Sequence, residues 1–315
     1  MSRTTFEALL DSGVHFGHLK RKWNPAMAPY IFMERNGIHI IDLYKTMAKM
    51  DEAAAALKQI SKSGKRILFV ATKKQAKEIV AEHVKKINMP YVTERWPGGM
   101  LTNFATIRKA VRKMASIDKL MSGPSFNNIS KKERLTVTRE RAKLEKNLGS
   151  IADLNRLPAA VFIVDILKEH IAVAEAKKLN IPTFAIVDTN SDPRQVDFPI
   201  PANDDASKSI SLIIEVMVKA IEEGIVERKL DRDKKAVDDE RAESREDDLE
   251  IKTKGAGFVA DEEEEEEGIT IVSKDFVETK VPKIKGLTEV AEEKPKVPRK
   301  RISKPAGGGG KPGKK

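Results

Sequence analysis

Paired glycines in the segment TERWPGGMLTNF, residues 93–104, are the first feature of this chain that could do chemistry. A short apolar run precedes the segment, and apolar residues at helical spacing follow it. Glycines between a strand and a helix let backbone N–H groups approach a phosphate closely. That phosphate would belong either to a nucleotide in an enzyme's cleft or to the backbone of a nucleic acid. The third alternative is a purely structural turn with Trp96 packed inside.

Motifs of nucleotide-dependent and hydrolytic enzymes are missing from the sequence. It contains no GxxxxGK[S/T] phosphate loop, no GxSxG turn and no cysteine, and its one GxGxxG match lies in a glycine-rich tail. Carboxylates at Asp165, Asp188 and Asp192 follow apolar runs, where catalytic or metal sites form at strand ends, but turns and caps use the same residues. The alternative hypothesis is thus a nucleotide-dependent enzyme on a doubly wound α/β sheet. An increase in the protein's thermal stability on adding a nucleotide would support it.

A second segment, SGVHFGHLKRKWNPAM at residues 12–27, combines histidines, cations and a tryptophan. The two histidines would bind a metal only with a third ligand from elsewhere, so we predict no metal site and expect donors to phosphate or carbonyl groups. Cations neutralise phosphates, and a flat ring can stack on an exposed base. The alternative is a solvated basic turn beside a buried ring. The candidates for nucleic-acid binding in this segment are His15, His18, Lys20, Arg21, Lys22 and Trp23.

The sequence Thr72-Lys-Lys-Gln75 closes one apolar run and begins a helical pattern. Its spacing predicts a capping box, with Thr72 and Gln75 as the reciprocal partners. Lys73 and Lys74 would then lie at a helix N-terminus, where the helix dipole already favours an anion. The segment is either an anion site or a structural cap alone.

Short apolar runs alternate with amphipathic segments through the first 230 residues, and this alternation predicts the fold class. The runs RILFVAT, AVFIVD and TFAIVD predict strands at 66–72, 160–165 and 183–188, and GIHIID and MPYV are weaker candidates at 37–42 and 89–92. Helices are predicted over residues 43–61, 73–87, 168–179 and 207–223. Continuously apolar strands are buried on both faces, so we predict an α/β fold with a parallel sheet covered by helices on both sides.

The stretch at about 102–152 interrupts this alternation with two helical patterns of heptad spacing, joined by SGPSFNNIS. Ser130-Lys-Lys-Glu133 predicts a capping box that begins the second helix. The pattern indicates an inserted antiparallel coiled-coil hairpin. An anionic partner is favoured over a merely solvated helix face, because residues 101–150 hold 12 basic and 4 acidic side chains. The candidates for contact with that anionic partner are Arg108, Lys109, Arg112, Lys113, Lys131 and Lys132.

Charge is divided unevenly along the 315 residues, whose formal net charge is +10. Residues 1–150 carry 29 Lys and Arg against 13 Asp and Glu. Residues 231–315 form an acidic and then a basic block, which predicts a mostly disordered extension after a domain at 1–230. The absence of cysteine, of a signal peptide and of a long apolar run predicts a cytoplasmic, soluble protein without a membrane partner.

Several long segments, in their order along the chain, resemble the bacterial form of the ribosomal protein S2 family. They are SGVHFGHLKRKWNPAMAPYIF, NGIHIIDL, RILFVATKKQAKEIV, RWPGGMLTNF and FIVDILKEHIAVAEAKKLNIPTFAIVDTNSDP. The resemblance runs from about Thr4 to Glu227. It implies a non-catalytic, RNA-binding structural protein with a flavodoxin-like three-layer parallel sheet and a protruding coiled-coil hairpin.

Members of that family sit between head and body on the solvent side of the small subunit, near the messenger exit. The resemblance therefore implies small-subunit ribosomal RNA and neighbouring ribosomal proteins as partners, including the large messenger-binding one that the family helps to dock. It implies no cofactor and no small-molecule substrate. It also favours the nucleic-acid backbone as the partner of the glycine turn. The RNA-binding candidates there are Arg95, Trp96, Gly98, Gly99 and Asn103.

Overall fold

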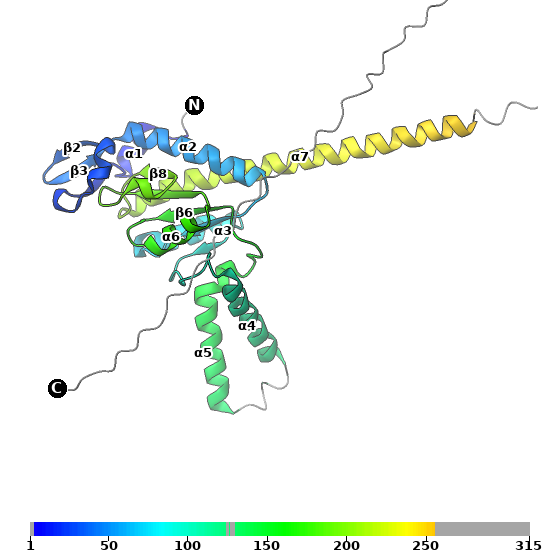
Figure 1. Ribbon diagram of the computed structural model, residues 1–315, viewed down its shortest axis with the longest axis horizontal. Helices are drawn as coiled ribbons and strands as arrows, with labels where there is room; N and C mark the ends of the chain where they lie inside the picture. The colour runs from blue at the N-terminus through cyan, green and yellow to red at the C-terminus, as the bar shows by residue number, and fades with distance from the viewer. Residues whose placement is uncertain (1–2, 124–125, 127–129, 256–315) are drawn as a thin grey trace, which may run out of the picture. The chain divides into compact units, whose positions relative to one another are not determined.

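A parallel five-stranded sheet forms the centre of the domain (Figure 1). The computed structural model describes residues 3–123, 126 and 130–255. In spatial order the strands are β5 (Tyr91–Val92), β4 (Ile67–Val70), β6 (Ala160–Val164), β7 (Thr183–Val187) and β8 (Phe198–Pro201). Numbered along the chain within this sheet, that order is 2-1-3-4-5, which is the doubly wound order of flavodoxin-like sheets.

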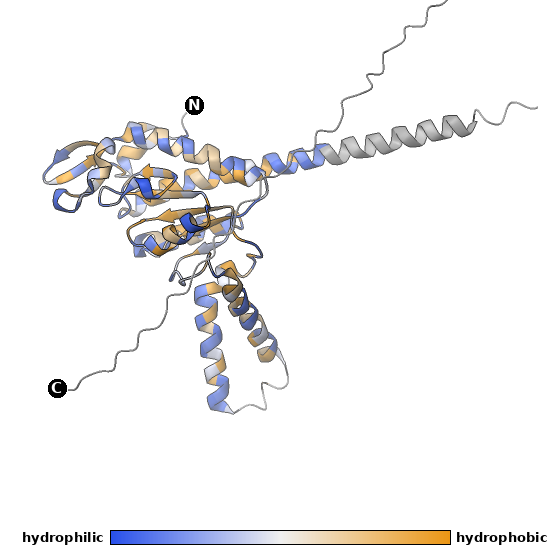
Figure 2. Cartoon of the chain, in the orientation of Figure 1, coloured by the Kyte–Doolittle hydropathy of each residue, from blue (hydrophilic) through white to orange (hydrophobic). Residues whose placement is uncertain are grey.

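Helices cover both faces of this sheet, as the continuously apolar strands predict. On one face Phe69, Phe162 and Phe184 pack against α2 (Leu43–Lys62), α3 (Lys74–Lys86) and α7 (Ser207–Gly255). On the other face Leu68, Val161 and Ala185 pack against α6 (His170–Lys178) and the 96–101 loop. Figure 2 shows the central strands coloured as hydrophobic. The α/β prediction is therefore confirmed, with a sheet between two layers of helices.

Strand β8 escapes the sequence pattern because its sequence is FPIP. Proline lacks an N–H donor and is confined to the edges of sheets. β8 pairs with β7 in parallel and is the last strand of the described sheet, so it lies at an edge.

A separate antiparallel sheet of three strands holds the N-terminal segment: β1 (Phe16–Leu19), β3 (Ile38–Ile41) and β2 (Ile31–Arg35). It follows α1 (Phe6–Asp11). The run at 37–42 does form a strand, but not in the parallel sheet that the alternation predicted. Asn36 and Gly37 adopt positive φ angles of 53° and 75°, which suit a tight hairpin turn, so β2 and β3 pair with each other.

Two helices lie between β5 and β6 in the chain, α4 (Phe104–Ser122) and α5 (Lys131–Leu148). The predicted capping box is confirmed: the Ser130 hydroxyl accepts from the Glu133 N–H, and the Glu133 carboxylate accepts from the Ser130 N–H. The bases of the two helices pack together through Ile107, Val111 and Leu144 and continue into the core beneath α6. Short 3-10 helices complete the described elements, at Lys20–Lys22, Pro25–Tyr30, Gly149–Ile151 and Pro193–Gln195.

Helix α7 runs from Ser207 to Gly255, past the predicted domain boundary at residue 230. The part of the predicted disordered extension at 256–315 lies outside the described residues. Among the residues that the structure describes, none of the helices has the length and apolar character needed to cross a bilayer.

Candidate nucleic-acid interface

The glycine turn is organised around the carboxylate of Glu175, which lies in the middle of α6 and is buried. The backbone N–H groups of Gly99 and Leu101 donate to its two oxygens over 2.7 and 2.9 Å. The N–H of Thr102 donates over 3.2 Å, and the indole N–H of Trp96 over 3.1 Å. The turn is thus a cradle of amides, as phosphate-binding turns are, but an internal carboxylate occupies it. Because these amides already have an acceptor, the phosphate interpretation does not apply to them.

Two of the turn's predicted residues, Trp96 and Gly99, have structural roles in this arrangement. Only 7% of Trp96 is exposed, so its ring packs in the core and offers little surface for stacking on a base. Gly99 has a φ of +82°, which accounts for glycine at this position. These positions favour the structural-turn alternative for Trp96 and Gly99.

The other candidates of the turn face outward. Arg95 and Gly98 are exposed, and Gly98 has open space where a side chain would lie. Asn103 precedes α4 and accepts a hydrogen bond from the Thr106 hydroxyl over 2.8 Å.

The basic segment at 20–23 lies at the end of β1. Lys20 pairs with Glu34 over 2.7 Å, whereas Arg21 and Lys22 are exposed. Trp23 is 36% exposed, and its ring lies 5.1 Å from the ring of His39, measured between centroids. Part of the indole therefore remains accessible to a partner.

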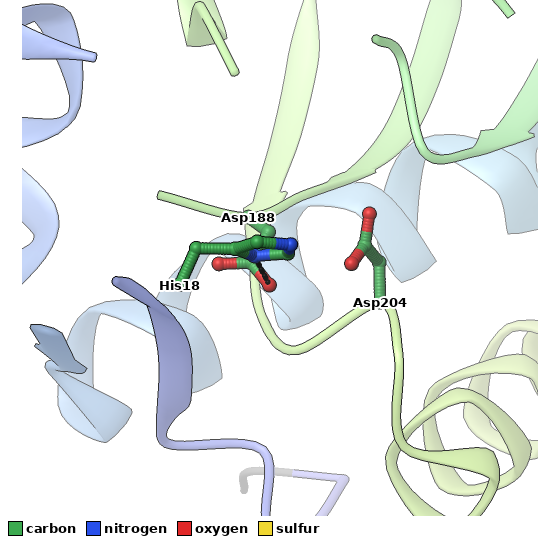
Figure 3. A group of neighbouring side chains, drawn as sticks. All are labelled: His18, Asp188 and Asp204. Carbon is green, nitrogen blue, oxygen red and sulfur yellow. Dashed lines mark ion pairs between the residues drawn. The ribbon is translucent and has the colours of Figure 1, made fainter. Parts of the chain in front are cut away.

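His18 is positioned at the carboxyl end of the parallel sheet by its own backbone, whose N–H donates to the Thr189 hydroxyl over 2.8 Å. Its ring Nδ1 lies 2.8 Å from the Asp188 carboxylate (Figure 3). Its Nε2 lies 3.4 Å from the carboxylate of Asp205. The hydrogen bond with Asp188 raises the pKa of His18 above its ordinary value. Burial together with the nearby charges of Asp188 and Asp165 raises the pKa of Asp204 to about 7.

One ligand atom from each of His18, Asp188 and Asp204 lies within 4.8 Å of the others, so these three residues could hold a divalent cation. One buried carboxylate oxygen of Asp204 has no hydrogen-bond partner among the described residues. His15 is not part of this group, and its buried Nδ1 has no hydrogen-bond partner in the part of the chain that the structure describes. Of the two histidines singled out from the sequence, His18 joins this group, and so does Asp188, which ends the predicted 183–188 strand.

Lys73 also belongs to this carboxylate cluster and not to an open anion site. Its ammonium lies 2.8 Å from Asp204, 2.6 Å from Asp205 and 3.7 Å from Asp165. The predicted capping box at 72–75 is wrong, because α3 has Lys73 as its N-cap without a side-chain hydrogen bond. The Thr72 hydroxyl contacts the Glu169 carboxylate instead. Lys74 begins α3 and is exposed.

The cations of α4 and α5 fall into two groups. Arg108 donates to the backbone oxygen of Leu154 and to the Asn155 side chain, and Lys113 pairs with Glu140 on α5. These contacts hold the helices to the domain and to each other. The remaining predicted cations are exposed and form no ion pair within the part of the chain that the structure describes: Lys109, Arg112, Lys131 and Lys132.

The chain is therefore an α/β protein in which the buried polar groups of the turn and of α6 are hydrogen-bonded to each other. The two helices inserted between β5 and β6 expose cations. Within that class the chain belongs to the ribosomal protein S2 family, since the model of the family described as "Ribosomal protein S2" matches residues 9–224. This is a family of structural ribosomal proteins and not of enzymes.

Three similar proteins carry the same description, "Small ribosomal subunit protein uS2". The one from Phocaeicola vulgatus is 70% identical over 232 residues, which is 74% of this chain and 83% of the relative. Those from Bacteroides thetaiotaomicron and Porphyromonas gingivalis are 68% and 67% identical over 232 residues, 74% of this chain and 84% and 83% of the relatives.

Proposed function

We propose that this chain is a structural component of the small ribosomal subunit that binds ribosomal RNA between head and body, on the solvent side, in the cytoplasm. The exposed cations of α4 and α5 carry the proposal, because they form no ion pair within the described residues and can contact phosphates. Family membership and the excess of 29 basic over 13 acidic residues in the first 150 support it.

Helices α4 and α5 would act in this role as an antiparallel coiled-coil hairpin. Apolar contacts join their bases, and ion pairs join them further out, between Lys113 and Glu140 and between Asp118 and Arg141. The Arg141 Nε lies 2.7 Å from the Asp118 carboxylate. Such pairing would hold the two helices together while their exposed cations contact RNA.

Replacing Lys109, Arg112, Lys131 and Lys132 with alanine should weaken RNA binding and flatten its salt dependence. Each lost phosphate contact lowers the slope of log K against log salt by about 0.7 to 0.9. Four lost contacts should therefore reduce the slope by about 3. The measurement is binding to small subunits depleted of this protein, across a salt series.

The matched control removes four exposed lysines from other surfaces: Lys65, Lys177, Lys178 and Lys208. Melting temperatures should be similar for both quadruple variants and for the unchanged chain, since all eight side chains are exposed. An equal salt slope in the two variants would show that the α4 and α5 cations are merely solvated and would contradict the proposal.

An apolar groove beside the antiparallel sheet is our candidate for docking the large messenger-binding protein of the subunit. It has a volume of about 560 Å³ and is lined by aromatic side chains of α1, β1, β2 and α2. Phe32 and Tyr44 are each 71% exposed, which is unusual for side chains of this size. Phe6 stacks on Tyr44 with 5.1 Å between ring centroids, so part of the aromatic surface is fixed before a partner binds.

Replacing Phe32 and Tyr44 with alanine should weaken docking of that protein at least on the order of 10-fold, because aromatic anchors commonly dominate interface energies. The measurement is its affinity for subunits reconstituted with each variant. RNA binding should not change. Leu157→Ala is the control, because Leu157 is 46% exposed and lies outside the groove. Undiminished docking in the double variant would place that partner elsewhere.

A further inference from the structure

A cavity of about 890 Å³ opens between the glycine turn, the bases of α4 and α5, and the beginning of α6. Pockets that bind small organic groups commonly measure about 300 to 1,000 Å³. The cavity is separate from the His18 cluster and from the aromatic groove, since it shares no lining residue with either.

The cavity lies at the place where a doubly wound sheet usually binds its ligand. Strand β5, which follows β4 in the chain, pairs with one edge of β4, and β6 pairs with its other edge. The strand order therefore reverses direction between β4 and β6. Thr72 follows β4, and Lys168 and Glu169 follow β6, and all three line the cavity. Ligands of such folds bind outside the carboxyl ends of the strands at this reversal.

The walls of the cavity combine apolar surface with cations. Ile107, Ala110, Leu144 and Ile171 provide apolar side chains, and Ile171 is 46% exposed. At the rim stand Arg95, Lys143 and Lys168, each exposed and without an ion pair in the described residues.

The carboxylates that line the cavity already have partners in the protein. Glu94 pairs with Lys77 and Lys146, and Glu140 pairs with Lys113. Glu169 accepts from the Thr72 N–H over 3.3 Å and contacts its hydroxyl. The Lys168 ammonium donates to the Thr72 backbone oxygen over 2.9 Å, but its charge, like those of Arg95 and Lys143, has no carboxylate partner in the described residues. The three rim cations therefore favour an anionic ligand over a peptide with an apolar side chain alone.

We propose that this cavity receives one unpaired nucleotide of ribosomal RNA, with its base against the apolar walls and its phosphates on the rim cations. An unpaired base exposes a flat face that needs apolar contact, and its phosphates need cations, so one nucleotide satisfies both features. The inference rests on the proposed function and deepens it by assigning a specific contact outside the exposed cations of the hairpin.

Gly98→Trp is the test, because it adds a bulky ring at the wall of the cavity without straining the turn. Gly98 lines the cavity, its φ is not positive, and a Cβ built on it meets nothing within 4 Å. Gly98→Ala is the matched control, which adds a side chain too small to fill the cavity. Small subunits depleted of this protein are reconstituted with each full-length variant, and base-specific chemical probing then reports every unpaired nucleotide.

The expected result is a local loss of protection. At least one unpaired nucleotide protected by the unchanged chain and by Gly98→Ala should return, with Gly98→Trp, to the reactivity of subunits lacking the protein. Substituting alanine for Arg95, Lys143 and Lys168 together should expose the same nucleotide. Protection by the α4 and α5 cations should persist with Gly98→Trp, which shows that the variant is folded and bound.

An RNA protection pattern that Gly98→Trp does not alter would overturn the inference while leaving the proposed function intact. With that unchanged pattern, loss of a crosslink to a neighbouring protein would make a peptide the occupant. A melting shift with free mononucleotides that Gly98→Trp abolishes would instead make a free nucleotide the occupant. If the unchanged chain protected no RNA, the proposed function itself would fail.

Discussion

Replacing Glu175 with alanine should lower the free energy of unfolding by about 3 kcal/mol or more. The change leaves the N–H groups of Gly99, Leu101 and Thr102 and the indole N–H of Trp96 without their acceptor. Each buried donor without a partner costs about 1 to 3 kcal/mol, although water can enter at the more exposed ones. Urea unfolding followed by tryptophan fluorescence measures the change, since Trp96 lies beside the substituted residue.

Lys178→Ala is the control for Glu175→Ala, because it removes an exposed charge from the same helix and should change stability by less than about 0.5 kcal/mol. The loss of stability caused by Glu175→Gln should lie between those caused by Glu175→Ala and Lys178→Ala. Glutamine keeps the shape and one acceptor oxygen but turns an amide group toward N–H donors. If Glu175→Ala were as stable as the control, the turn would not depend on this carboxylate.

The pH dependence of stability gives an independent check of the same contact. Burial by itself would raise the pKa of Glu175, but the backbone N–H donors of Leu101, Gly99 and Thr102 and the Trp96 indole N–H outweigh it and hold the pKa below the ordinary 4.5. A carboxyl whose pKa is lowered by folding contributes stability above its unfolded pKa and loses it as the pH falls through the folded value. The unchanged chain should therefore lose more stability below pH 4.5 than Glu175→Gln does.

The central fold could be predicted from sequence because its signals are local. A continuous run such as AVFIVD contains in itself the reason for burial on both faces, and β6 forms over residues 160–164 as expected. The strands β1 and β2 were missed because they form a half-exposed sheet, in which few residues are buried. Their pairing with β3 depends on a turn at Asn36 and Gly37 and not on an apolar pattern.

The organisation of the interface could be predicted only in part, because it depends on contacts between distant residues. The sequence singled out the glycine turn but not Glu175, which is more than 70 residues away and binds it. One signal was available: Glu175 falls among Ala172, Val173 and Ala176 on the apolar stripe of its helix. A lone carboxylate on a buried stripe needs donors from elsewhere, and a turn rich in free amides can supply them.

The roles of the cations on α4 and α5 could likewise be predicted only in part from the sequence. Sequence composition indicated that the 101–150 region is basic, but it could not separate the cations that hold α4 and α5 in place from those available to a partner. Arg108 and Lys113 have internal partners, whereas Lys109 and Arg112 do not form ion pairs within the described residues. Spacing alone cannot make that distinction, since all four lie within two turns of one helix.

Gly224→Ala should destabilise the protein by about 2 kcal/mol, although the same change inside most helices stabilises them by about 0.5 to 1 kcal/mol. The reason is the close crossing of α2 and α7. A Cβ built on Gly224 would clash with the Ser61 hydroxyl and would lie 2.5 Å from the backbone oxygen of Lys58. Gly149→Ala is the matched control, because its added Cβ meets only the Glu145 side chain at an ordinary 3.5 Å. Chemical denaturation measures the free energy of unfolding of the two variants. Gly224→Ala should lower it clearly more than Gly149→Ala does, and the two changes can differ in sign.

Adding Ser61→Ala to Gly224→Ala separates the two sources of the clash. Alone, Ser61→Ala should cost about 1 kcal/mol, because the buried Ser61 hydroxyl donates to the backbone oxygen of Ile221 over 2.7 Å. In the Gly224→Ala background, Ser61→Ala should cost less than about 1 kcal/mol, because it also removes the hydroxyl oxygen that the new methyl group meets. Full recovery is not expected, because the Lys58 oxygen belongs to the backbone of α2 and cannot move without the helix. Strict additivity of the two changes would show that the helices separate before the Ser61 contact matters, and complete recovery would show that Lys58 does not limit their approach.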